Sequence, residues 1–135
     1  MSEGETYAAV RAHLVREGKV LFGEKRSRRG LWTTVGGKSE AGESAEETLR
    51  REVREELGIE VTAFRRLPDR ERTQEGRPGR VAVFAVSGWV GTPENHAPHE
   101  HAAIRWFTRE ELESICLADD ARAEATGLYA SQKEE

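Results

Sequence analysis

Residues 37–59 read GKSEAGESAEETLRREVREELGI, and this stretch predicts a loop followed by a helix. A glycine-containing loop leads into a helix whose two ends are both marked. Ser44 and Glu47 have the Ser-x-x-Glu spacing of a capping box, which predicts the start of the helix, and Gly58 predicts its end. The apolar stripe of this helix repeats every four residues and comprises Leu49, Val53 and Leu57.

Three glutamates stand on the same helix at positions i, i+3 and i+4, namely Glu52, Glu55 and Glu56. At about 100° per residue, their carboxylates share one arc beside the apolar stripe. Carboxylates crowded in this way repel one another, and a divalent cation relieves the repulsion. Oxygen ligands favour Mg²⁺, for which Mn²⁺ is expected to substitute, and Mg²⁺ commonly keeps phosphate oxygens in its shell. The pattern therefore predicts a Mg²⁺ site and a phosphorylated substrate.

The wider stretch resembles the signature of the Nudix hydrolases, the MutT-like family. Seven residues stand in register with that signature: Gly37, Glu43, Arg51, Glu52, Glu55, Glu56 and Gly58. The segment VLFGEKRSRRGLWTTVGGKSEAGE (20–43) is similar to the strand, basic loop and Trp that precede the signature in many relatives, and IRWFTREEL (104–112) resembles their last strand and helix. The resemblance implies an α/β (α+β) fold, a Nudix-like α/β/α sandwich with a mixed central sheet.

The resemblance also implies a role for each matching residue. Glu55 and Glu56 correspond to the principal metal ligands, and Glu52 to a further ligand or the general base. Gly37 corresponds to the glycine whose backbone carbonyl joins the metal shell. Glu43 corresponds to the loop glutamate that supports the metal site.

Two further residues are catalytic candidates. Arg51 is expected to orient carboxylates rather than touch substrate, because an i, i+4 contact with Glu55 is available to it. Glu100 lies six residues before Trp106, where relatives often carry an additional acid that acts as base or ligand. An ordinary loop glutamate is the alternative for Glu100.

The sequence offers three candidates for substrate binding: Arg26, Trp32 and Lys38. Arg26 ends a strand that is predicted to face the cleft. Many relatives carry Pro where this chain has Val35, and some place a base-stacking aromatic residue where it has Thr34. Trp32 is the nearby residue that would substitute in stacking a base.

The histidines and arginines outside the motif leave two questions open. The histidines around Glu100 match no usual structural-zinc spacing, so we expect solvated loop residues rather than a zinc site at His96, His99 and His101. The Arg-rich segment 65–80 could close over an anionic substrate or form a solvated hairpin tip.

The remaining pattern predicts six strands and two more helices. The strands are expected at 7–16, 20–22, 31–35, 59–67, 81–86 and 103–107. A capping box at Thr108 predicts a helix reaching Leu117, and a short third helix is expected over 119–125, stopped by Gly127. Residues 68–80 are expected to form a polar connection.

Composition sets outer bounds. With 135 residues, 36% hydrophobic and 34% charged, the chain is expected to form one domain over 1–135, with ends fraying at about 1–5 and 128–135. The net charge of −4 argues against extended nucleic-acid binding. A lone cysteine, Cys116, and the lack of a membrane span or signal peptide favour the cytoplasm.

These residues predict metal-dependent hydrolysis of the diphosphate linkage of a nucleoside diphosphate derivative. The favoured substrate is a nucleoside triphosphate, including oxidised forms, split to monophosphate and pyrophosphate. The alternatives are ADP-ribose, a dinucleoside polyphosphate or capped RNA. Two alternatives of another class are a non-catalytic nucleotide sensor and a Mg²⁺-stabilised interaction domain. Many Nudix relatives form a homodimer, and the sequence leaves the oligomeric state open.

Overall fold

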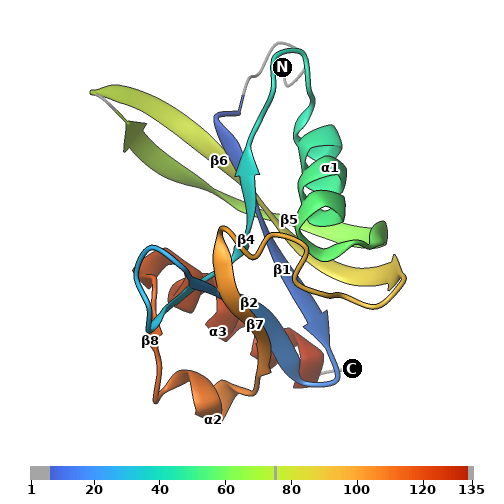
Figure 1. Ribbon diagram of the computed structural model, residues 1–135, viewed down its shortest axis with the longest axis vertical. Helices are drawn as coiled ribbons and strands as arrows, with labels where there is room; N and C mark the ends of the chain where they lie inside the picture. The colour runs from blue at the N-terminus through green and yellow to red at the C-terminus, as the bar shows by residue number, and fades with distance from the viewer. Residues whose placement is uncertain (1–6, 75, 134–135) are drawn as a thin grey trace.

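The computed structural model describes residues 7–74 and 76–133. It is a mixed α+β structure with a twisted sheet between two helices (Figure 1). The strands are β1 Ala9–Arg16, β2 Lys19–Lys25, β3 Leu31–Thr33, β4 Val35–Lys38, β5 Glu60–Gln74, β6 Arg77–Val90, β7 His101–Phe107 and β8 Cys116–Leu117. The helices are α1 Ala45–Leu57, α2 Arg109–Leu112 and α3 Asp119–Lys133. The expected ends at 1–5 and 134–135 lie outside the described residues.

The sheet is mixed, as predicted. Its order is β5-β6-β1-β2-β3-β8, with β4 paired to β1 and β7 paired to β2. β1 runs parallel to β6 and antiparallel to β2 and β4, so it has three strand partners. β1 and β2 are joined by a tight turn in which Glu17 (φ 50°) and Gly18 (φ 77°) are both left-handed, the conformation of a hairpin turn that matches strand twist.

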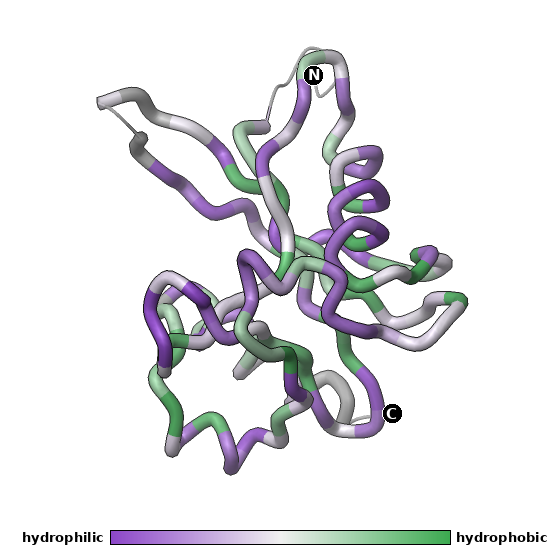
Figure 2. Tube along the Cα trace, in the orientation of Figure 1, coloured by the Kyte–Doolittle hydropathy of each residue, from purple (hydrophilic) through white to green (hydrophobic). Residues whose placement is uncertain are grey.

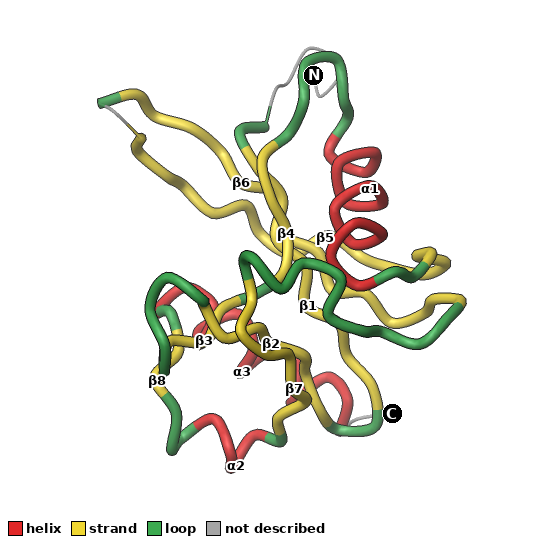
Figure 3. The backbone as a smooth tube through the Cα atoms, viewed as in Figure 1, coloured by secondary structure: helices red, strands yellow, loops and turns green. Residues whose placement is uncertain are grey.

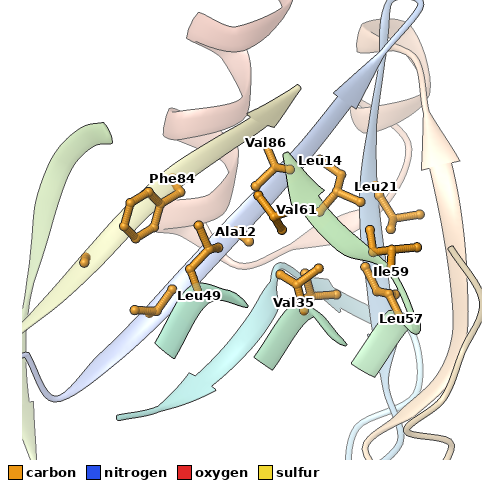
Figure 4. Packing of buried hydrophobic residues seen from close by; sticks show 13 residues of the cluster. Ala12, Leu14, Leu21, Val35, Leu49, Leu57, Ile59, Val61, Phe84 and Val86 are labelled. Carbon is orange, nitrogen blue, oxygen red and sulfur yellow. The ribbon is translucent and has the colours of Figure 1, made fainter. Parts of the chain in front are cut away.

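Two separate cores lie on the two faces of the sheet. The first joins α1 to β1, β4, β5 and β6, and Figure 4 shows its side chains interleaved between helix and sheet. Leu49, Val53 and Leu57, the predicted stripe, are fully buried in it. The second core packs α3 against β2, β3 and β7. Residues 81–86, predicted as a strand, lie in β6 and are all buried, as in strands that are covered on both faces.

The predicted helix α1 is confirmed at both ends. Ser44 accepts a hydrogen bond from Glu47 N, and the Glu47 side chain accepts one from Ser44 N. Gly58 ends the helix with a left-handed φ of 72°. Hydrophilic and hydrophobic residues recur along every part of α1 (Figure 2), as expected of a helix with one face on the core and the other outward.

Residues 68–80 were expected to form a polar connection, and this expectation is wrong. β5 continues to Gln74 and β6 begins at Arg77, so the segment forms the outer part of a long hairpin that projects from the rest of the structure (Figure 1). The register shifts between Leu67 and Arg70, which accommodates Pro68, a residue without an N–H for the ladder. Asp69 pairs with Arg66 at 2.6 Å and with Arg80 at 3.1 Å. Backbone hydrogen bonds between β5 and β6 and the ion pairs of Asp69 thus stabilise a hairpin of hydrophilic residues.

Two expectations near the C-terminus are also wrong. The helix begun by the Thr108 capping box ends at Leu112 instead of reaching Leu117, because Cys116–Leu117 pairs with β3 as β8 (Figure 3). α3 does not stop at Gly127 and continues to Lys133. Leu128 and Tyr129 are buried in the second core, so burial outweighs the modest cost of a glycine inside a helix. The chain therefore does not fray from residue 128.

Candidate functional site

The three motif glutamates have very different exposure on α1. Glu56 points toward the core side and is 2% exposed, whereas the Glu55 side chain is 57% exposed and that of Glu52 is 14% exposed. This gradient follows from their positions around the helix, because Glu56 lies next to the buried stripe. The carboxylates therefore run from the protein interior to the surface of a cleft.

Arg51 binds the carboxylates around it. Its guanidinium donates to Glu43 at 2.6 and 2.9 Å, to Glu52 at 2.8 Å and to Glu55 at 3.3 Å. A further N–H donates to the backbone carbonyl of Lys38 at 2.9 Å. The predicted contact with Glu55 is confirmed, and hydrogen bonding to Glu43 raises the pKa of Arg51. Arg51 thereby fastens α1 to the loop that precedes it.

Glu43 supports this arrangement from the loop. Hydrogen bonding from Arg51 lowers the pKa of Glu43 to about 2. Thr48 Oγ1 donates to Glu43 at 2.9 Å, and the amide of Glu40 donates to it at 2.8 Å. Glu43 thus links the motif loop to the helix, a structural contact that fits the supporting role predicted for it.

Both carboxylate oxygens of Glu56 accept hydrogen bonds in the interior. Gly36 N donates to one oxygen at 3.2 Å, and His101 Nε2 lies 2.6 Å from the other. The neighbouring strand approaches closely: a Cβ placed on Gly37 would lie 2.4 Å from the Glu52 carboxylate. Burial, and then the Glu56 carboxylate, raise the pKa of Glu52. Negative charge is therefore crowded at this point of the structure.

A cleft of about 730 Å³ opens in front of these carboxylates. Its acidic lining comes from α1, from the loop before α1 and from the end of the loop before β7: Glu52, Glu55, Glu40 and Glu100. Its basic lining comes from the strands and from α1: Arg11, Lys25, Lys38 and Arg51. Arg11 NH1 donates to the carbonyl of Thr34 at 3.3 Å, and burial lowers the pKa of Arg11. The cleft therefore contains both carboxylates and cations.

Most of the predicted site residues meet at this cleft. It is lined by Gly37, Lys38, Arg51, Glu52, Glu55 and Glu100, while Glu43 and Glu56 stand behind the lining and bind members of it. Arg26 lies elsewhere: its side chain donates to the carbonyl of Pro98, and its neighbour Lys25 reaches the cleft instead. Trp32 is also absent from the lining, because it is 9% exposed and packs edge-on against Phe107.

Three residues of the site were missed by the sequence analysis. Arg11 lies in a strand with no motif, and only the pairing of Arg11 with Gly36 places it beside the signature. Regular strand alternation would place Lys25 on the face opposite to Arg26, but the strand register shifts between Glu24 and Lys25. His101 follows Glu100 directly, and that adjacency was the one signal available for it.

The three histidines around Glu100 do not form a common site. Among the described residues, the one group with metal-ligating atoms within 4.8 Å of one another is Glu56, Glu100 and His101. His99 is exposed and His96 packs its ring against Gly58. His101, in contrast, is 5% exposed and begins β7, so the expectation of a solvated loop residue is wrong for His101.

The residues present suit a hard divalent cation. The acidic lining of the cleft and Glu56 supply carboxylate oxygens, and the raised pKa of Glu52 reports charge that a cation would neutralise.

A helix that crosses a membrane must be both long and apolar. In the described part of the chain, none of the helices meets both requirements.

The chain is similar to known proteins over most of its length. The family model described as NUDIX domain matches residues 5–131. The chain is 37% identical over 112 residues to the CTP pyrophosphohydrolase of Escherichia coli, covering 81% of each chain, and 33% identical over 113 residues to the nucleoside triphosphatase NudI of an Enterobacter species, covering 77% of each.

The fold of the chain is similar to that of a solved structure over nearly its whole length. The solution structure of the E. coli ORF135 protein superposes with a TM-score of 0.77 at 32% identity, covering 94% of this chain and 93% of that one. The chain therefore belongs to the Nudix family of hydrolases, which act on phosphoric anhydride bonds of nucleotide substrates and generally use divalent metal ions.

Proposed function

We propose that this protein is a Mg²⁺-dependent pyrophosphohydrolase that splits a nucleoside triphosphate into the monophosphate and pyrophosphate. The observation that carries the proposal is the mixed lining of the cleft, in which Glu52, Glu55 and Glu100 occur together with cations of the strands. A triphosphate chain needs both kinds of residue, because its oxygens bind the cations directly and bind the carboxylates through divalent metal. The names of the two relatives, a CTP pyrophosphohydrolase and a nucleoside triphosphatase, support this substrate class.

The metal would be held by Glu52, Glu55 and Glu56, with the backbone carbonyl of Gly37 as a further donor. When bound, Mg²⁺ or Mn²⁺ neutralises the diphosphate and makes a coordinated water a stronger nucleophile. Arg51 keeps Glu52 and Glu55 in place for this task by donating to both. In the reaction, a water oxygen bonds to phosphorus, the bridging P–O bond breaks, and a carboxylate of the cleft, Glu52 or Glu100, accepts the proton.

Arg11 and Lys38 are the proposed substrate-binding residues on the basic side. Arg11 donates to the carbonyl of Thr34, which leaves further guanidinium donors for phosphate or base. Arg26 and Trp32, the residues expected from the sequence, do not line the cleft. We therefore expect Arg11 rather than Trp32 to contact a bound base.

The test is a product analysis with a panel of nucleotides. CTP, the other common triphosphates, an oxidised purine triphosphate, ADP-ribose, a dinucleoside tetraphosphate and NAD-capped RNA are each incubated with Mg²⁺ or Mn²⁺. Monophosphate and pyrophosphate are then separated by anion exchange. We expect a triphosphate to be the best substrate by kcat/KM. Faster turnover of one of the other three classes would replace the proposed substrate, and no metal-dependent turnover of any nucleotide would favour the sensor hypothesis.

The variant Glu56→Gln is designed to remove charge and keep shape. We expect kcat/KM to fall more than about 100-fold, because contacts behind a metal ligand already cost 10–100-fold when lost. Glu46→Gln is the matched control: Glu46 lies on the same helix but pairs with Arg50 at 3.2 Å, and its side chain is 54% exposed. Full activity of Glu56→Gln would show that Glu56 does not hold the metal.

A further inference from the structure

His101, the first residue of β7, is a buried polar residue outside the Nudix signature. It is 5% exposed, and its Nε2 lies 2.6 Å from a carboxylate oxygen of Glu56, which is itself 2% exposed. In the tautomer with hydrogen on Nε2, the ring donates this hydrogen bond to the carboxylate. The other ring nitrogen, Nδ1, is buried and has no partner among the described residues. Within the described part of the chain, the polar contact of the imidazole is therefore with the innermost glutamate of the motif.

A glycine, Gly23, lies directly behind the His101 ring. Gly23 of β2 lies against the imidazole, and a Cβ placed there would be 2.5 Å from Nδ1 and 3.0 Å from two ring carbons. Gly23 has no left-handed φ, so a turn does not explain the glycine. The space above Gly23 is instead filled by the His101 ring. The ring is thus held between a bare strand and Glu56.

The backbone of His101 is fixed as closely as its ring. Its amide donates to the carbonyl of Ala97 at 2.9 Å, and its carbonyl accepts from Asn95 Nδ2 at 2.8 Å. The same loop returns to α1, where the amide of His96 donates to the backbone carbonyl of Glu56 at 2.8 Å. One loop therefore binds Glu56 twice, at its main chain through His96 and at its side chain through His101.

We propose that His101 is a positioning residue that holds Glu56 in the orientation needed to bind the catalytic metal. A free glutamate samples several rotamers, and ordering them on metal binding costs free energy. Glu56 accepts from His101 on one oxygen and from Gly36 on the other, which fixes the plane of the carboxylate before metal arrives. This inference rests on the proposed function, because it assigns Glu56 to the metal.

The experiment compares His101→Leu with His101→Gln. Leu fills the space without a donor, whereas the Gln amide places an N–H near the position of Nε2. Manganese affinity is measured by isothermal titration and by the electron paramagnetic resonance signal of free Mn²⁺, and kcat and KM are measured on the best triphosphate. We expect His101→Leu to bind Mn²⁺ about 10–100-fold more weakly and to lose kcat with little change in nucleotide KM. His101→Gln should recover most of both.

Two further variants separate positioning from general damage. His13→Leu is the matched control, because His13 is equally buried and pairs with a glutamate, Glu124 at 2.8 Å, but on the α3 face of the sheet. It should keep Mn²⁺ affinity even if its melting temperature falls. Gly23→Ala should displace the ring and weaken Mn²⁺ binding without touching Glu56, whereas Gly79→Ala, in a strand where a Cβ has ordinary contacts of 3.4 Å or more, should not.

The proposal is overturned by any of three results: His101→Leu binds Mn²⁺ as tightly as the parent; His101→Gln gives no recovery; or pulsed resonance of the Mn²⁺-loaded parent shows ¹⁴N coupling from a directly bound imidazole, which would make His101 a ligand. If His101→Leu does not fold, His101→Gln and Gly23→Ala still test the proposal. Absence of turnover in the parent would contradict the proposed function, and the Mn²⁺ affinities would still report on His101.

Discussion

Gly127 offers a test of the C-terminal part of the fold. If α3 continues through Gly127, alanine at this position should stabilise the protein, whereas if the helix stops there, alanine should destabilise it. In the structure, Gly127 lies inside α3 with no left-handed φ, and a Cβ added there would have no atom within 4 Å. Alanine should therefore fit without strain. The sequence pattern had suggested a helix that stops at this glycine, and a stop of that kind places glycine in the left-handed conformation. Alanine in that conformation would be strained.

The expected gain follows from helix propensity. Ala is favoured over Gly inside a helix by about 0.5–1 kcal/mol. For a chain of 135 residues, the unfolding entropy near 60 °C is about 0.28 kcal/mol/K, so Gly127→Ala should raise Tm by about 2–4 °C. The assay is thermal unfolding followed by circular dichroism, with urea titration as a second measure of the free energy of unfolding.

Gly18→Ala is the matched control for this prediction. A Cβ on Gly18 would also meet nothing within 4 Å, but its φ is 77°, so only the backbone conformation differs between the two sites. We expect Gly18→Ala to lower Tm and Gly127→Ala to raise it. A fall in Tm for Gly127→Ala would refute the continuous helix and restore the stop at Gly127.

Two predictions concern pH and stability. The pKa of Glu43 is about 2 in the folded protein because of Arg51, so Glu43 stabilises the fold above its ordinary pKa of 4.5, and this stabilisation is lost as pH falls toward 2. Urea titrations should show Glu43→Gln less stable than the parent at pH 7, with the gap narrowing as pH falls from about 5 toward 2; a constant gap would contradict the assignment. Burial raises the pKa of Tyr129 to about 12, and its hydroxyl donates to the carbonyl of Phe107 at 2.5 Å. Tyr129→Phe should cost about 1–2 kcal/mol at pH 7, and the parent alone should lose stability between pH 10 and 12; equal alkaline profiles would exclude this role.

The motif helix could be predicted from the sequence because its signals are local. The capping box at Ser44, the stop at Gly58 and the four-residue stripe depend on residues within one or two turns of one another. The contact of Arg51 with Glu55 is equally local. The grouping of Glu52, Glu55 and Glu56 was predictable for the same reason, since these three carboxylates lie on that one helix.

Contacts made across the sheet could not be predicted in this way. Arg11 reaches the cleft because β1 pairs with β4, and Trp32 leaves it because the second core takes up its ring. Residues 70–74 and 77–80 form strands because β5 and β6 supply each other's backbone hydrogen bonds, an influence that β propensity does not contain.

The loop between β6 and β7 also closes the C-terminal end of α1. The amides of Glu94 and His96 donate to the carbonyls of Leu57 and Glu56, which a helix end otherwise leaves to water. Local opening of this loop would expose those carbonyls and release His101 in the same event, so the two walls of the cleft should open as one cooperative unit. Amide hydrogen exchange at Glu94, His96 and His101 should then share one opening free energy, because the loop that carries Glu100 could not open without also loosening the helix that carries the proposed metal ligands.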